Sequence, residues 1–128
     1  MSRILVVDDD ALQLDLYKQL LEIAGYHVEI AFSASGTVRR LEIAAANLAI
    51  DVLIMDLRFP NAVGTPDARE GMALIRRIRD LGFGAPVIVL SGWPEDLYGQ
   101  PEEHLVSRIL PKPVGARELL SAIRDLLA

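Results

Sequence analysis

Val52-Leu53-Ile54-Met55 is a run of four apolar residues that ends abruptly at Asp56, and it indicates the class of fold. A short, continuously apolar run of this kind is typical of a strand buried on both faces, as in a parallel sheet. The carboxylate marks the point where the strand leaves the core. The end of this strand is therefore a candidate position for a functional group.

Four further strand patterns lie on either side of this stretch, and helical patterns separate them. The predicted strands cover residues 4–7, 28–32, 86–90 and 106–110. The first predicted helix covers residues 10–24. The second begins near Ser33 or Ser35, the third begins at Gly71 and the last begins near Gly115. Residues 94–105 predict only a short or irregular helix, because Gly99 and Pro101 interrupt it. This alternation predicts one α/β domain over residues 1–128, with parallel strands and helices on both faces of the sheet.

Each of the four clear helical patterns has an apolar stripe at helical spacing. The stripes are Leu12, Leu16, Leu20 and Ile23 in the first helix, Val38, Leu41, Ala45 and Leu48 in the second, Met72, Ile75 and Ile78 in the third, and Leu119, Leu120, Ile123 and Leu127 in the last. Asp10 is the predicted N-terminal cap of the first helix, and Gly25 is its predicted stop.

Composition narrows the class of protein. The net charge of −5 offers no basic cluster for nucleic acid, and the absence of cysteine excludes disulfides and thiolate chemistry. No apolar run approaches the ~20 residues that a membrane span needs. The chain begins directly with a strand pattern, so we expect no signal peptide and a cytoplasmic protein.

The carboxyl ends of the predicted strands carry residues with a common chemistry. Asp8 and Asp9 follow the first strand, Asp56 the third, Ser91 the fourth and Lys112 the fifth. In an open parallel sheet these ends meet at one edge, where ligands bind. Mutually repelling carboxylates there favour Mg²⁺, which takes oxygen ligands. With a cation and a hydroxyl added, the set predicts a phosphoryl-transfer site with a carboxylate nucleophile.

Taken singly, each of these residues has a plainer interpretation. An aspartate after a strand can begin a loop or cap a helix, and Asp10 is better explained as a cap. Ser91 alone would be an ordinary serine at a strand end, and Lys112 alone a solvated lysine. Their joint placement at the same edge of one sheet favours the functional interpretation.

Four segments together resemble the receiver domain of bacterial response regulators, and the resemblance covers the whole chain. They are ILVVDD (4–9), DVLIMDLRFP (51–60), VIVLSG (87–92) and LPKP (110–113). The resemblance implies a flavodoxin-like sheet of strand order 2-1-3-4-5. It also implies two-component signalling by a phosphoprotein that is a phosphoryl acceptor rather than an enzyme acting on a separate substrate.

The family's residue roles carry over by position. Asp56 would accept a phosphoryl group from a histidine kinase or phosphotransfer protein. Asp9, Asp56 and the carbonyl of Arg58 would hold Mg²⁺, and Asp8 would act largely through metal-bound water. Lys112 would pair with the phosphoryl group and Ser91 would bond to it. A downstream protein is then the expected target, a second copy of the chain is a further candidate partner, and neither nucleic acid nor a membrane is expected.

Two features depart from the family pattern. Gly71 follows Asp56 at an unusually long distance, and we expect residues 61–70 to be mobile or to form a distinct recognition loop. Ile109 stands three residues before Lys112, where the family usually has an aromatic residue. Because Ile109 is β-branched and stiff, it cannot reproduce a ring flip. Trp93 is the alternative carrier of the signal, unless its ring simply packs on the edge of the last helix. The Lys112–Pro113 peptide bond is expected to be cis.

Three other functions compete with this interpretation. A degenerate receiver would bind a partner without phosphorylation, but the acidic, hydroxyl and lysine set is complete. A phosphatase of the haloacid-dehalogenase type would need a second aspartate where Arg58 stands, and it would need a cap domain. A nucleotide or flavin binder would need a glycine-rich loop after the first strand, and none is present there.

Overall fold

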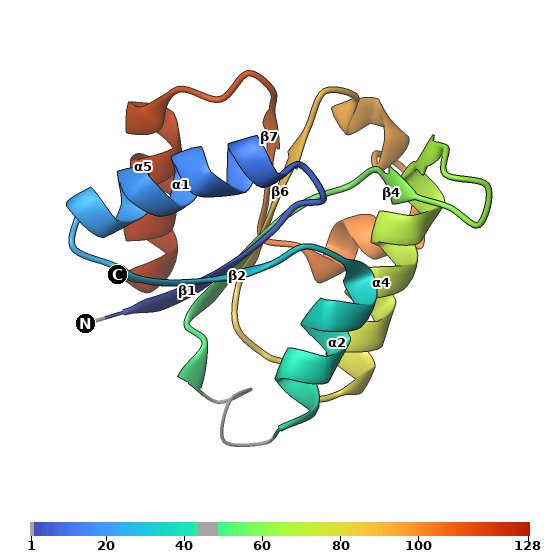
Figure 1. The fold of residues 1–128 in the computed structure, drawn as a ribbon, viewed down its shortest axis with the longest axis horizontal. Helices are drawn as coiled ribbons and strands as arrows, with labels where there is room; N and C mark the ends of the chain where they lie inside the picture. Colours follow the sequence, from blue (N-terminus) through green and yellow to red (C-terminus); the bar gives the residue numbers. More distant parts are fainter. Residues whose placement is uncertain (1, 44–48) are drawn as a thin grey trace.

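Five parallel strands form one sheet in the computed structural model, which describes residues 2–43 and 49–128 (Figure 1). They are β1 (Arg3–Val7), β2 (His27–Ala31), β3 (Val52–Asp56), β6 (Val87–Ser91) and β7 (Arg108–Pro111). Their spatial order is β2-β1-β3-β6-β7, and every neighbouring pair is parallel. Counted in chain order, this is the expected order 2-1-3-4-5, so the predicted fold class is confirmed.

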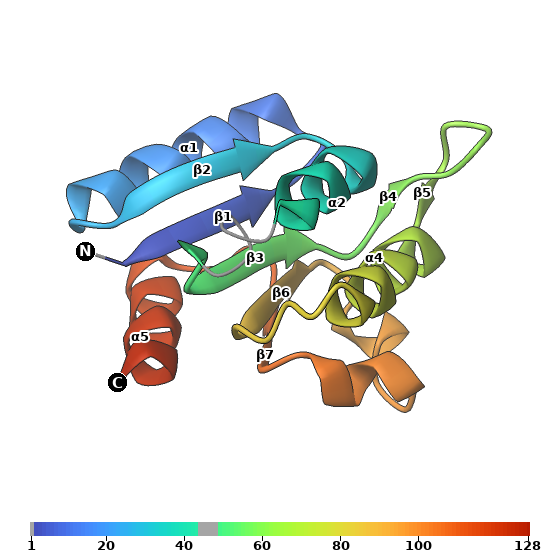
Figure 2. The same cartoon turned by 90° about the horizontal axis from the view of Figure 1, so that it is seen from below.

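In the part of the chain that the structure describes, four α-helices longer than one residue cover the two faces of this sheet (Figure 2). They are α1 (Ala11–Ile23), α2 (Ala34–Glu42), α4 (Ala68–Asp80) and α5 (Ala116–Leu127). Helices α1 and α5 share an apolar core with one face of the sheet, and α2 and α4 share another core with the opposite face. Because both faces are covered, the apolar residues of the central strand β3 are all buried, as the unbroken run around Leu53 predicts.

Both predicted ends of α1 are confirmed. The Asp10 carboxylate accepts hydrogen bonds from the backbone N–H groups of Leu12 and Gln13, at 3.0 and 3.3 Å. After the helix, Gly25 has a φ of +99°, a left-handed conformation that favours glycine. Its N–H donates to the carbonyl of Glu22 at 3.0 Å, which closes the last turn.

The apolar stripe predicted for α1 is wrong for three of its four residues, because only Leu20 packs against the core. Leu12, Leu16 and Ile23 are each more than half exposed, whereas Leu14 and Leu21 are buried. Apolar residues lie on more than one side of this helix, so helical spacing alone fits two different stripes. The sheet selects the stripe that contains Leu14, and it leaves Leu12 and Leu16 on the surface.

The other predicted helices agree better with the structure. Ser33 caps α2, and its Oγ accepts a hydrogen bond from the N–H of Gly36 at 3.0 Å. Leu41 of α2 is buried and Val38 packs against the same core. The remaining predicted members of that stripe, Ala45 and Leu48, lie outside the described residues. In α4 and α5 the predicted stripes face the two cores, with Ile75, Ile78, Leu119 and Ile123 fully buried.

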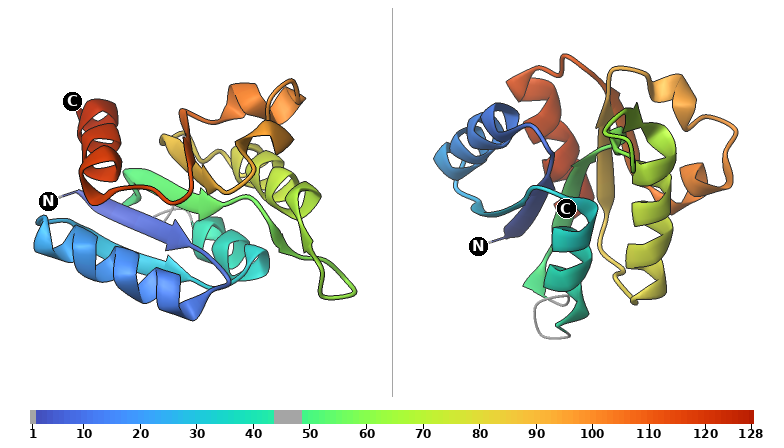
Figure 3. Two further views of the ribbon diagram at one scale, coloured as in Figure 1. Left: turned by 90° about the horizontal axis from the view of Figure 1, so that it is seen from above. Right: turned by 45° about the vertical axis from the view of Figure 1, so that its right-hand side comes forward.

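The segment after Asp56 is a β-hairpin rather than an irregular loop. Strands β4 (Phe59–Pro60) and β5 (Pro66–Asp67) pair antiparallel, and the hairpin projects from the body of the molecule (Figures 2 and 3). The Asn61 carboxamide oxygen accepts hydrogen bonds from the N–H groups of Val63 and Thr65, at 3.0 and 3.1 Å. These bonds explain how so polar a segment holds a defined shape.

Gly71 does not open the third predicted helix. Helix α4 begins at Ala68, because the carboxylate of Asp67 accepts a hydrogen bond from the Arg69 N–H at 2.9 Å and caps it. Gly71 lies within the first turns, against the backbone of Leu57. A Cβ at position 71 would lie 2.7 Å from the carbonyl carbon of Leu57. The glycine thus permits close packing of the helix on the end of β3, and it does not mark a boundary.

Residues 94–105 form two short 3-10 helices, η1 (Pro94–Asp96) and η2 (Pro101–Leu105), as their proline and glycine content predicts. The last helix begins one residue after Gly115, and strands β2 and β7 are offset from their predicted ranges by one or two residues. Among the described helices, none has the length and apolar character to cross a membrane.

Candidate functional site

The strand ends meet at one edge of the sheet, as expected for parallel strands. Val7 pairs with Met55, and Asp56 pairs with Leu90 one step further along. Ser91 pairs with Pro111, so the residues that follow β1, β3, β6 and β7 emerge side by side. The register therefore brings together side chains that are far apart in the sequence.

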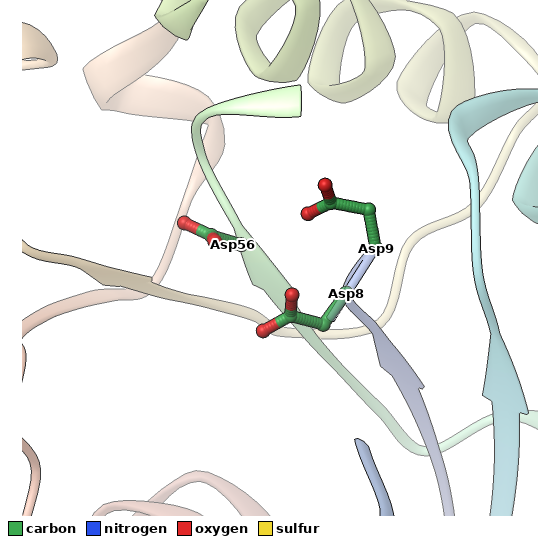
Figure 4. Close-up of side chains that lie close together, drawn as sticks. All are labelled: Asp8, Asp9 and Asp56. Atoms are coloured by element: carbon green, nitrogen blue, oxygen red, sulfur yellow. The ribbon is translucent and has the colours of Figure 1, made fainter. Parts of the chain in front are cut away.

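Three carboxylates form a cluster at this edge. Oxygens of Asp8, Asp9 and Asp56 all lie within 4.8 Å of one another (Figure 4). Asp8 is buried, Asp56 is partly buried and Asp9 is exposed. The Asp8 carboxylate accepts a hydrogen bond from the N–H of Asp10 at 2.9 Å, which fixes its orientation.

Lys112 places a positive charge against this cluster. Its Nζ donates a hydrogen bond to Oδ2 of Asp56 at 3.2 Å and lies 3.6 Å from Oδ2 of Asp8. Burial acts to lower the pKa of Lys112, but attraction to Asp56 and Asp8 outweighs it, and the pKa is raised. The lysine is therefore charged near neutral pH. The Lys112–Pro113 peptide bond is cis, as expected.

The carboxylates of the cluster repel one another even with Lys112 present. Burial is the largest cause that raises the pKa of Asp8, and repulsion from Asp56 and Asp9 raises it further. The N–H of Asp10 and the charge of Lys112 act in the opposite direction but do not cancel the effect. One lysine thus compensates only part of the negative charge that the fold assembles here.

Ser91 lies beneath the site rather than on its surface. It is buried, and its Oγ accepts a hydrogen bond from the N–H of Trp93 at 3.0 Å. Its neighbour Gly92 lines the cavity above the cluster, whereas Ser91 itself does not. The hydroxyl hydrogen of Ser91 can still be donated to a ligand, because the bond to Trp93 uses only a lone pair.

An open cavity of about 550 Å³ lies above the carboxylates. Its lining includes the three carboxylates and Lys112. Arg58 and Trp93 also line it, as do Thr65 and Pro66 of the hairpin. The predicted acidic residues and the lysine therefore share one cavity with Arg58.

Several features of this cavity escaped the sequence-based prediction. The Arg58 guanidinium stacks on Trp93, with 3.7 Å from its central carbon to the ring centre, and its Nε donates to Asp96 Oδ2 at 2.9 Å. The prediction used only the carbonyl of Arg58. The alternative that Trp93 packs on the edge of the last helix is wrong, because its ring is half-exposed and lies against Arg58. Only the hairpin geometry places Thr65 here, and no pattern in the sequence signals it.

The donor set fits a hard divalent cation. Carboxylate oxygens within 4.8 Å of one another can share one ion, and the open cavity leaves room for water ligands. Mg²⁺ commonly takes one or two carboxylates with several waters. A cation would also relieve the repulsion that raises the pKa of Asp8. The residues present are therefore suited to Mg²⁺.

Comparisons with known proteins all indicate the same family. The family model described as the response regulator receiver domain matches residues 4–124. Response regulator MprA of Mycobacterium ulcerans is 32% identical over 128 residues, which are 98% of this chain and 50% of that protein. MprA of Mycobacterium leprae is likewise 32% identical, with the same coverage. The chain spans about half the length of these curated relatives.

Solved structures have the same fold over the whole chain. A response regulator receiver domain protein from Clostridium thermocellum has a TM-score of 0.83 at 29% identity, covering 99% of this chain and 94% of that one. Response regulator TrrA from Thermotoga maritima, solved in complex with Mg(2+)-BeF, has a TM-score of 0.81 at 22% identity. That match covers 98% of this chain and 99% of that one.

Proposed function

Because the chain belongs to the response regulator receiver domain family, we propose that Asp56 accepts a phosphoryl group from a phosphohistidine of a histidine kinase or phosphotransfer protein. The single observation that carries this proposal is the position of the Asp56 carboxylate. It lies at the end of the central strand, open to the cavity, next to Asp8 and Asp9 and within 3.2 Å of Lys112.

The transfer is a substitution at phosphorus. An oxygen of the Asp56 carboxylate donates an electron pair to phosphorus as the bond from phosphorus to the imidazole nitrogen breaks. The electron pair of that bond stays with the imidazole. Lys112 is placed to bind an oxygen of the transferred group, because its Nζ already contacts Asp56. Ser91 can donate its hydroxyl hydrogen to another phosphoryl oxygen if its side chain turns toward the cavity.

Mg²⁺ is the proposed cofactor. Asp9, Asp56 and the carbonyl of Arg58 would hold it directly, Asp8 would act largely through water, and the ion would supply positive charge for the phosphoryl oxygens. The clustered carboxylates support this assignment. The complex of TrrA with Mg(2+)-BeF concerns a protein of the same fold and agrees with it.

The partner proteins must reach the cavity from its open side. Leu12 and Leu16 lie exposed on α1, which begins two residues after Asp9. Exposed apolar side chains next to a reactive site are typical of a protein-binding surface. We place the phosphodonor protein against this side of the domain. After phosphorylation, a changed surface near β6, β7 and the segment between them would bind a downstream protein.

The test is intact mass after incubation with a small phosphodonor such as acetyl phosphate and Mg²⁺. The wild-type chain is expected to gain the mass of one phosphate, and Asp56→Asn is expected to gain none. A gain retained in full by Asp56→Asn would refute the acceptor assignment. The same experiment separates the competing functions, because a degenerate receiver stays unmodified and a phosphatase turns over phosphate esters continuously.

A further inference from the structure

Arg58 connects the acceptor cavity to the segment that follows β6. Its side chain lines the same cavity as Asp56, and its guanidinium also stacks on Trp93 and bonds Asp96. Trp93 lines the cavity too, whereas Asp96 lies outside it in η1. A single cation thus contacts both the predicted acceptor site and the segment in which we place the output surface.

The ion pair with Asp96 uses only part of the donor capacity of Arg58. A guanidinium carries five N–H donors and often binds a carboxylate through two parallel bonds. Here only Nε donates, at 2.9 Å, and within residues 2–43 and 49–128 the two terminal nitrogens have no hydrogen-bond acceptor. Those nitrogens are available to an anion in the cavity without competition from another bond.

A phosphoryl group on Asp56 would be such an anion. It carries about two negative charges, against one on Asp96. Lys112, the cation beside Asp56, is already shared with Asp8, so the added charge favours a further cation besides the proposed Mg²⁺. Both members of the Arg58–Asp96 pair are partly exposed. Water therefore screens part of the attraction within this pair, which lowers its contribution to the free energy.

A second link from the site also ends at Trp93. The buried Oγ of Ser91 accepts the N–H of Trp93, and the carbonyl of Trp93 accepts the N–H of Asp96 at 3.0 Å. If the Ser91 side chain turns toward a phosphoryl group, this bond is lost as well. Both changes act on η1, the three-residue turn that follows β6. On the neighbouring strand β7, Ile109 has no aromatic ring that could carry the signal instead.

We infer that Arg58 is a phosphoryl-responsive latch. In the unmodified protein it holds Trp93 and Asp96. When Asp56 carries a phosphoryl group, the guanidinium turns to that group and releases both residues, which changes the protein-binding surface over residues 93–100. The latch rests on the proposed function, since it needs a phosphoryl group on Asp56. It gives the side chain of Arg58 a role of its own, separate from the role proposed for the Arg58 carbonyl.

Tryptophan fluorescence tests the latch directly, because Trp93 is the only tryptophan in the chain. The full chain is titrated with beryllium fluoride, a mimic of the phosphoryl group, in the presence of Mg²⁺. Wild-type emission is expected to change on saturation. In Arg58→Gln the resting emission should already be shifted toward the saturated state, and the amplitude of the change should be roughly twofold or more smaller, because the stacked cation is gone.

Asp96→Asn provides the opposite test. It removes the charge that competes for Arg58, so half-saturation should occur at an adduct concentration lower by about twofold to fivefold. Arg77→Gln is the matched control. It removes another arginine–carboxylate contact, 3.7 Å to Glu42, on an exposed face of α4 away from the cavity, and it should behave as wild type.

Intact mass with acetyl phosphate, measured on the same samples, distinguishes a failure of the latch from a failure of the proposed function. If Asp56 gains phosphate but Arg58→Gln keeps the full fluorescence change, or Asp96→Asn leaves half-saturation unaltered, the latch is wrong and the acceptor assignment stands. If no variant gains phosphate, the proposed function fails and the latch fails with it. Phosphorylation of the wild type without any change in Trp93 emission also overturns the latch.

Discussion

The Nζ atom of Lys112 lies 3.2 Å from Oδ2 of Asp56, although 56 residues separate the two in the chain. The contact joins the end of β3 to the residue that follows β7, across the intervening strand β6. It is the shortest contact of this lysine with the acidic cluster, since Asp8 is 3.6 Å away. The proposed acceptor is thus paired with a cation before any phosphoryl group arrives.

Lys112→Met should lower the free energy of unfolding near neutral pH, on the order of 1 kcal/mol. The folded-state pKa of Lys112 is raised above its ordinary value of 10.5 by Asp56 and Asp8, against the opposing effect of burial. Its charge therefore contributes stability that is fully present below 10.5 and is lost as the pH rises through the folded-state pKa. Urea unfolding of both proteins at several pH values measures this. If the free energies of unfolding of wild type and Lys112→Met differed equally below pH 10.5 and above the folded-state pKa, the prediction would be contradicted.

Asp8→Asn should raise the free energy of unfolding near neutral pH, again on the order of 1 kcal/mol. Burial, with repulsion from Asp56 and Asp9, raises the pKa of Asp8 above 3.8, so its ionised form is disfavoured in the folded state. Below 3.8 the carboxyl is protonated both folded and unfolded, and the gain should vanish there. The gain should build up as the pH rises through the folded-state pKa. Unfolding curves that show Asp8→Asn less stable than wild type at neutral pH would count against this interpretation of the cluster.

Asp9→Ala should abolish Mg²⁺ binding and phosphorylation while the domain stays folded. Asp9 is exposed, so its loss removes a proposed ligand without opening the core. Chelation of the metal should not unfold the wild type either, because two apolar cores hold the sheet. Amide shifts during an Mg²⁺ titration measure the binding, and circular dichroism measures the fold. Asp15→Ala, which removes an exposed carboxylate from α1, is the control; undiminished Mg²⁺ binding by Asp9→Ala would refute the ligand assignment.

Gly71→Ala should destabilise the domain by roughly 1–3 kcal/mol. An added Cβ would lie 2.7 and 2.8 Å from backbone atoms of Leu57, directly after the proposed acceptor, so the helix or the strand end must shift. Gly84→Ala is the matched control, since a Cβ there meets no atom within 4 Å. Thermal unfolding of the two variants gives the comparison. Equal melting temperatures would show that α4 moves without strain.

Deletion of residues 61–65 should leave the fold intact but alter the lifetime of the phosphoryl group. The tip of the hairpin projects from the body of the molecule, and Val63 within it is exposed. Thr65, which lies beside Pro66 in the cavity wall, is removed by the deletion, so access of water to Asp56 should change. Decay of the phosphorylated mass over time measures the lifetime. Global unfolding on deletion would instead make the hairpin a structural element.

The fold class and the proposed chemistry could both be predicted from the amino-acid sequence. Short buried strands such as the run before Asp56 have a local apolar signature, and they alternate with helical patterns in chain order. In a parallel sheet, chain order and strand direction already place Asp8, Asp56 and Lys112 at one edge. These predictions depend on local patterns and general rules of topology, so they needed no coordinates.

The lining of the cavity and the contacts between its side chains could not be predicted in this way, because they depend on how distant segments pack. The exposed side of α1, the start of α4 at Ala68 and the hairpin that brings Thr65 to the site all depend on packing between distant segments. The contact of Arg58 with Trp93 and Asp96 joins two loops that follow different strands. Side-chain partners of this kind follow from three-dimensional proximity, which spacing along the chain does not encode. For that reason the sequence predicted a role only for the backbone carbonyl of Arg58. The structure shows that its charged side chain lies between the acceptor cavity and η1.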